Sequence, residues 1–214
     1  MTNLFSYDGL IYKAGTKIFQ LMVLNLLYLI TCLPLVTIGA ANAALTAVTM
    51  KMIEGKAGHV AIDYLRAFKT NFKLATIYHL IFTVINILVL LNYLFAGTVA
   101  APIQPLVYLA LGLAGVISLV GMTFIFPYIA RFDDNARTTA KNAGLLVLRH
   151  GKISLVILIV TLFPIVLAML TPVMMVFAIY LSTFIGFALV TYLKSFLLLS
   201  IYQQYPSNQK TKEI

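Results

Sequence analysis

The chain has 214 residues, of which 62% are hydrophobic and 10% are charged, and its mean hydropathy is +1.00. Soluble domains carry about a quarter charged residues, so this composition excludes an ordinary soluble domain. The formal net charge of +9 does not indicate a nucleic-acid partner, because the basic residues lie at the ends of hydrophobic runs, as topology signals do. The single cysteine, Cys32, excludes an internal disulfide and a multi-cysteine metal site.

The first hydrophobic run, residues 18–50, is too long for one ordinary span of about 20 residues. It is interrupted between Pro34 and Gly39, where the composition changes from large aliphatic residues to small ones. We therefore predict a hairpin with a full span at 18–36 and a short return helix at 39–53.

The return helix carries a ridge of small residues. Gly39, Ala43 and Ala47 recur at a spacing of four, with Ala40 and Ala44 beside them. Small residues let helix backbones approach closely, and this close packing holds membrane helices together. We expect the ridge to be a helix-packing interface, with another helix of this chain rather than with a second protein.

A charged segment follows at residues 54–73. Its apolar side chains, Phe68 and Phe72 among them, recur at helical spacing opposite the charges. This pattern is typical of an amphipathic helix at the membrane surface. We predict a cytoplasmic loop here, with Arg66, Phe68, Lys69 and Phe72 as candidate contacts for a partner protein.

Two further hairpins complete the chain, and a second charged loop at 130–152 separates them. Their turns contain no charged residue. The predicted spans are residues 74–96, 106–129, 153–170 and 173–197.

The second charged loop offers candidate partner contacts at Arg131, Asp133, Asp134 and Arg137. The adjacent aspartates are more typical of a helix cap and of charge balance than of a metal site, and we expect one of them to cap a short helix that runs toward His150.

Charge placement predicts the topology. All but one of the 15 basic residues lie in the N-terminal lead, in or beside the two charged loops, or in the tail. The positive-inside rule then places both termini and both loops in the cytoplasm, with about six crossings in three hairpins. A five-span alternative makes residues 39–53 re-entrant or interfacial. Lys194 is the exception, and we expect it to snorkel from the inner end of its helix. The predicted fold is an all-α, polytopic transmembrane bundle in a single domain, 1–214.

No reactive centre is evident in the sequence. The predicted spans contain no Asp or Glu, and the HExxH, GxSxG and phosphate-loop motifs are absent. We expect neither an enzyme nor a bound cofactor or metal. Two alternatives remain open. One is an independent transporter or channel for a small polar solute, with a polar path along Asn25, Thr83, Asn86 and Asn92. The other is a membrane enzyme that uses the paired loop aspartates.

Four segments resemble the YesL-like family of small bacterial membrane proteins, long listed as being of unknown function. Their order and spacing match over nearly the whole chain. The segments are LFSYDGLIYKAGTKIFQLMVLNLLYLI (4–30), LPLVTIGAANAAL (33–45), YLRAFKTNFKLATI (64–77) and RFDDNARTTAKNAGLLV (131–147).

The resemblance implies several transmembrane helices in the bacterial plasma membrane. Genes of this family tend to lie beside carbohydrate importers of the ATP-binding cassette (ABC) class and beside glycoside hydrolases. This kinship implies an accessory membrane subunit that binds the permease subunits and aids assembly or uptake of oligosaccharides. The chain lacks both the Gly-containing loop by which such permeases bind their ATPase and any nucleotide motif. We therefore do not expect it to be the permease or the ATPase.

Overall fold

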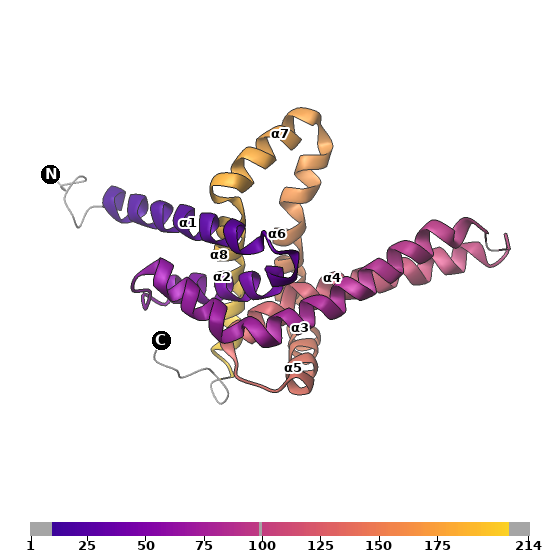
Figure 1. Ribbon diagram of the computed structural model, residues 1–214, viewed down its shortest axis with the longest axis horizontal. Helices are drawn as coiled ribbons and strands as arrows, with labels where there is room; N and C mark the ends of the chain where they lie inside the picture. Colours follow the sequence, from indigo (N-terminus) through magenta and orange to yellow (C-terminus); the bar gives the residue numbers. More distant parts are fainter. Residues whose placement is uncertain (1–9, 99, 206–214) are drawn as a thin grey trace.

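The computed structural model describes residues 10–98 and 100–205, and every regular element in this part is helical (Figure 1). Asp8 of the N-terminal lead and Lys210 and Lys212 of the tail lie outside the described residues. In chain order the elements are α1 (Leu10–Cys32), η1 (Leu35–Thr37), α2 (Ile38–Ile53), α3 (Val60–Phe95), η2 (Ala96–Thr98), α4 (Gln104–Arg131), α5 (Ala136–Arg149), α6 (Gly151–Leu170), α7 (Pro172–Leu181), the π-helical segment η3 (Ser182–Gly186) and α8 (Phe187–Tyr202).

Six helical stretches of the described residues are long and apolar enough to cross a membrane. The prediction of a polytopic all-α bundle is therefore confirmed. The stretches are Tyr12–Cys32, Leu35–Ile53, Val60–Thr98, Gln104–Arg131, Gly151–Leu170 and Pro172–Tyr202.

The third of these stretches differs from the expected boundaries. The sequence pattern separates a surface helix before residue 73 from a span that begins at residue 74, but α3 continues through both without a break. Its 36 residues contain neither Pro nor Gly, the residues that most readily interrupt a helix. The sequence pattern therefore changes along α3 from amphipathic to fully apolar, while the helical backbone continues without a break.

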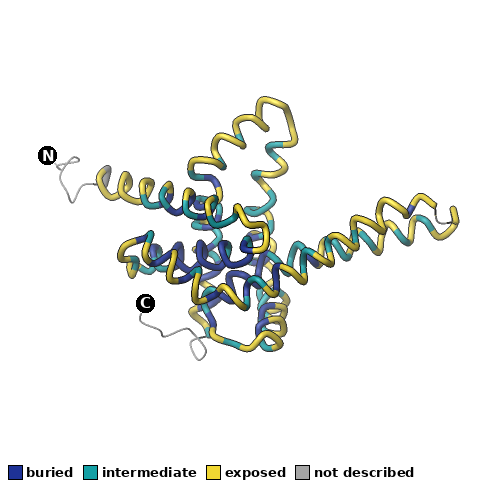
Figure 2. The backbone as a smooth tube through the Cα atoms, in the orientation of Figure 1, coloured by how far each residue is buried: buried dark blue, intermediate teal, exposed yellow. Residues whose placement is uncertain are grey.

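Helix α2 forms the centre of the bundle and contacts α1, α3, α4 and α8. Figure 2 shows it as the most continuously buried helix, and Ala40, Ala41, Ala43 and Ala44 are fully buried. Two buried clusters meet on it. One joins α2 to α3, α4, α5 and the end of α8, and the other joins it to α1 and the start of α3.

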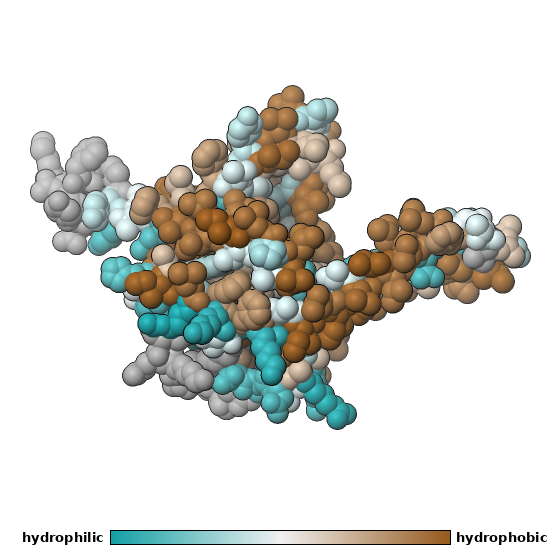
Figure 3. All heavy atoms as spheres, in the orientation of Figure 1, coloured by the Kyte–Doolittle hydropathy of each residue, from teal (hydrophilic) through white to brown (hydrophobic). Residues whose placement is uncertain are grey.

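Two hairpins diverge from this centre (Figure 1). The first, which we call the arm, comprises residues 80–117 of α3, η2 and α4. The second is the α6–α7 hairpin. Side chains along both are mostly exposed (Figure 2), and these exposed surfaces are hydrophobic, whereas hydrophilic side chains gather away from the two tips (Figure 3). Such surfaces require lipid or a protein partner to cover them.

Candidate functional site

The small-residue ridge of α2 faces other helices of this chain. Gly39, Ala40, Ala43, Ala44 and Ala47 are all buried. A Cβ atom added at Gly39 would lie 2.4 Å from the backbone oxygen of α3 residue 75 and 2.7 Å from a side-chain carbon of α3 residue 79. Only glycine permits this approach, so the ridge contributes to the internal packing of the bundle.

A network of ion pairs ties the charged end of α2 to α3 and α4. Glu54 Oε1 lies 2.8 Å from Arg131 Nη2, and its Oε2 lies 3.3 Å from Lys56 Nζ. Lys51 at the end of α2 pairs with Asp63 of α3 at 3.7 Å. Burial opposes ionisation of Glu54, but the hydrogen bond and charge of Arg131, with Lys56 adding to them, hold the pKa of this carboxyl below its ordinary value.

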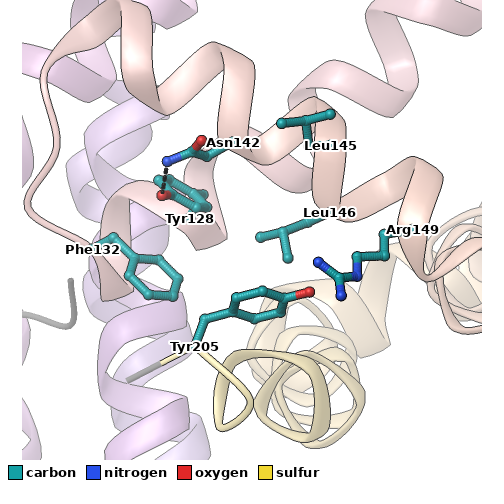
Figure 4. Close-up of a pocket in the computed structure, with 7 residues that line it drawn as sticks. All are labelled: Tyr128, Phe132, Asn142, Leu145, Leu146, Arg149 and Tyr205. Atoms are coloured by element: carbon teal, nitrogen blue, oxygen red, sulfur yellow. Dashed lines mark hydrogen bonds between the residues drawn. The ribbon is translucent and has the colours of Figure 1, made fainter. Parts of the chain in front are cut away.

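Close to this network, α4, α5 and the end of the described chain enclose a small pocket of about 210 Å³ (Figure 4). Asn142 donates a hydrogen bond to the Tyr128 hydroxyl at 3.0 Å, and that hydroxyl donates to Asp134 at 2.5 Å. On the other side of the pocket the Arg149 guanidinium lies 5.8 Å from the centre of the Tyr205 ring.

This geometry corrects the expected role of the aspartates. The N-cap residue of α5 is Asn135, and its side chain makes no capping hydrogen bond. Asp134 instead accepts hydrogen bonds from Tyr128 and from Asn142, the latter at 3.3 Å. Its carboxylate therefore fixes α5 against α4, while Asp133 is exposed.

The remaining candidate partner contacts do not converge on one point. Arg66, Lys69 and Phe72 are exposed on α3, and Phe68 is half-buried with its ring against Phe72 at 5.6 Å. Arg137 is exposed at the start of α5, whereas Arg131 is engaged by Glu54. Contact of these residues with a partner stays a prediction.

A large cavity lies between α1, α2 and the helices from α6 to α8, with a volume of about 1060 Å³. Small-molecule sites occupy roughly 300–1,000 Å³. Its walls are mostly apolar side chains of α6 and α7. Its polar lining comprises Tyr28, Asn42, Thr161, Thr171, Ser182, Thr183, Thr191 and Lys194. The Tyr28 hydroxyl donates to Asn42 Oδ1 at 3.3 Å, which joins two of these groups.

Lys194 is the one charged residue of this cavity lining. The sequence predicts that it snorkels from the inner end of its helix, and this stays a prediction; α8 continues to Tyr202, eight residues or about 12 Å beyond Lys194. Among the described residues Lys194 has no ion-pair partner. A charge at the centre of a membrane helix costs about 3 kcal/mol on insertion scales, so a lysine without an ion-pair partner in such a stretch is a candidate functional residue.

The wall of the cavity includes η3, the π-helical segment, which a side chain of α1 holds in place. Asn25 Nδ2 donates to the carbonyl oxygens of Ser182 at 2.9 Å and of Thr183 at 2.8 Å. Its Oδ1 accepts from the backbone N–H of Ala188 at 3.1 Å. A π-segment leaves backbone groups without their usual partners, and Asn25 satisfies three of them in one contact.

The structure does not assemble the polar path expected for a transporter. Thr83, Asn86 and Asn92 each donate to a carbonyl of their own helix, four residues earlier. They lie along the arm, whereas Asn25 contacts η3 and α8. The polar cavity around Lys194 was not predicted from the sequence. The one signal for it was a charged residue inside a predicted span.

Residues 21–93 match the family model described as "Protein of unknown function, DUF624", which is the YesL-like membrane protein family. The match covers 73 of the 214 residues, and over this stretch the chain is similar to the DUF624 family. The resemblance to the YesL-like family is thereby confirmed. The DUF624 match begins within α1 and ends near the tip of α3, so it includes Asn25, Tyr28, Asn42 and Gly39. No curated protein and no solved structure matches this chain.

Proposed function

We propose that this protein is a non-enzymatic accessory subunit of the bacterial plasma membrane. It binds the permease subunits of a carbohydrate ABC importer and aids assembly or uptake of oligosaccharides. The importer is the partner that the YesL-like resemblance implies. The observation that supports a partner role is the arm, an apolar helix pair that extends away from the other described helices (Figure 1).

The α4 side of the arm has the features of a helix-docking surface. Leu109, Leu113 and Ile117 recur at a spacing of four and are 60%, 55% and 70% exposed. Beside them, a Cβ atom added at Gly112 or Gly115 would meet nothing within 4 Å. Large aliphatic side chains around open small residues let a partner helix approach closely, which lipid chains do less well.

The proposal includes an orientation with the charged loops in the cytoplasm. The tips of both hairpins, at residues 97–105 and 171–172, carry no charge, while hydrophilic residues gather away from these tips (Figure 3). The positive-inside rule supports this orientation. The arm then faces the hydrophobic interior, where permease helices are found.

Copurification from the native host tests the proposal. The tagged protein is extracted in mild detergent, and the proteins recovered with it are identified and quantified by mass spectrometry. We expect a permease pair and its ATPase in stoichiometric amounts. Recovery of a stable, monodisperse chain alone would refute the subunit role.

A pair of variants tests the docking surface. Gly112→Leu fills the open position on the arm and should reduce permease recovery about tenfold, the effect of about 1.4 kcal/mol. Gly144→Leu is the matched control, because Gly144 on α5 also has nothing within 4 Å of an added Cβ. Equal recovery with both variants would exclude this face of the arm.

The cavity around Lys194 favours a second candidate, an independent transporter for a small polar solute. This function predicts solute flux into liposomes that contain only this protein, and loss of flux in the variant Asn42→Leu. Absence of flux from well-inserted protein would eliminate it.

A further inference from the structure

We propose that the cavity is a binding site for one anionic phospholipid. The phosphate binds Lys194, and the acyl chains lie along the α6–α7 wall. The site is independent of the proposed partner role, since the arm does not contribute to its lining.

The charge of the cavity lining identifies the ligand as an anion. Helices α1, α2, α6, α7 and α8 contain no Asp or Glu. Lys194 is therefore the one charge on the cavity wall, and no carboxylate of these helices balances it. A phosphate supplies the missing negative charge, and the lining Thr191 and Asn42 add hydrogen-bond donors for its oxygens.

The polarity gradient along the cavity fits an amphiphile. The polar groups Tyr28, Asn42 and Lys194 belong to α1, α2 and α8, whereas the α6–α7 wall is almost entirely aliphatic and aromatic. A ligand with an acidic head and long apolar chains matches both parts at once. A small hydrophilic anion leaves most of this wall uncovered.

The surroundings of the cavity favour a membrane lipid over a dissolved anion. The wall residues Met169, Leu170 and Phe177 are 82%, 66% and 62% exposed, so the α6–α7 hairpin presents apolar side chains to the bilayer as well as to the cavity. Lipid reaches such a site laterally, whereas a free anion must leave water first. Basic pockets between transmembrane helices are known sites for anionic headgroups.

A tryptophan reporter tests the site, because the chain contains no natural tryptophan. Phe177→Trp places the fluorophore on the cavity wall, and Phe95→Trp places it at the tip of the arm, 66% exposed before substitution. The full-length protein is reconstituted in neutral vesicles. A minor fraction of phosphatidylglycerol or of phosphatidylcholine carries bromine on its acyl chains and quenches nearby tryptophan.

We expect brominated phosphatidylglycerol to quench the Phe177→Trp fluorophore with about fivefold higher apparent affinity than brominated phosphatidylcholine, the preference that one basic residue confers. The arm reporter should respond equally to both lipids. When combined with Phe177→Trp, the substitution Lys194→Gln should abolish the preference for phosphatidylglycerol and Lys194→Arg should retain it. Lys73→Gln, which removes an exposed surface charge, should leave it unchanged.

Three outcomes would overturn the proposal. One is equal quenching of the cavity reporter by the two lipids in folded, monodisperse protein. Another is a phosphatidylglycerol preference that survives Lys194→Gln, which assigns it to the surface charges. The third is loss of the preference on addition of inorganic phosphate at constant ionic strength, which identifies a site for the free anion.

Discussion

Helix α2 and the helices of the arm are all apolar enough to be membrane spans, yet α2 is buried among other helices and the arm is exposed. Nearly every residue of α2 is buried, including Thr46, Thr49 and the alanines of this helix. Along the arm, large aliphatic side chains such as Leu90, Leu109 and Ile117 are more than half exposed.

The difference shows that side-chain size, rather than hydropathy, separates the two. Lipid chains are as apolar as leucine, so burying a leucine against another helix gains little in a membrane. Close contact between backbones gains more, and small residues permit it. The less hydrophobic helix therefore becomes the core, and the more hydrophobic arm remains available for lipid or a partner.

The strongest test of this comparison adds one methyl group to each region. Gly39→Ala places a Cβ atom 2.4 Å from a backbone oxygen of α3 and should destabilise the protein by about 3 kcal/mol. Gly112→Ala meets nothing within 4 Å and should stabilise the protein by about 0.5 kcal/mol through helix propensity. Thermal unfolding in one detergent measures both changes. Equal effects would show that α2 is not the packing centre.

The sequence allowed prediction of the small-residue ridge and the three hairpins, because spacing and hydropathy are local properties. It did not locate the cavity around Lys194, which forms where α1 and α2 meet helices more than a hundred residues away. Asn25 illustrates the limit. Its type and its place in a span suggested a polar path, but its actual partners, Ser182, Thr183 and Ala188, depend on a π-segment that no local motif announces.

A second pair of variants compares an asparagine that joins packed helices with an asparagine of the arm. Asn25→Leu leaves the carbonyls of Ser182 and Thr183 and the N–H of Ala188 without the Asn25 side chain, and should cost about 2 kcal/mol. Asn92→Leu removes only an exposed bond to its own helix on the arm, so stability should change by less than about 0.5 kcal/mol.

Thermal unfolding again gives the free-energy changes, and proteolysis reports the α7–α8 junction directly. We expect Asn25→Leu to expose this junction to cleavage while the arm is unaffected. If Asn25→Leu were as mild as Asn92→Leu, the η3 contact would not contribute to the stability of the bundle.

The smallest expected effect concerns the polar end of α2, where Glu54 bonds Arg131 at the base of α4. Because the pKa of Glu54 is lowered in the folded protein, its contribution to stability is complete above the ordinary pKa of about 4.5 and is lost as the pH falls through the lower, folded-state value. Glu54→Gln should therefore cost about 1 kcal/mol at neutral pH and nothing in acid. Unfolding midpoints across this pH range should show the stabilities of Glu54→Gln and of the natural chain becoming equal in acid. Asp133→Asn, which changes an exposed carboxylate, is the control. A constant difference between Glu54→Gln and the natural chain at every pH would mean that packing of this side chain, rather than its charge, joins α2 to the base of the arm.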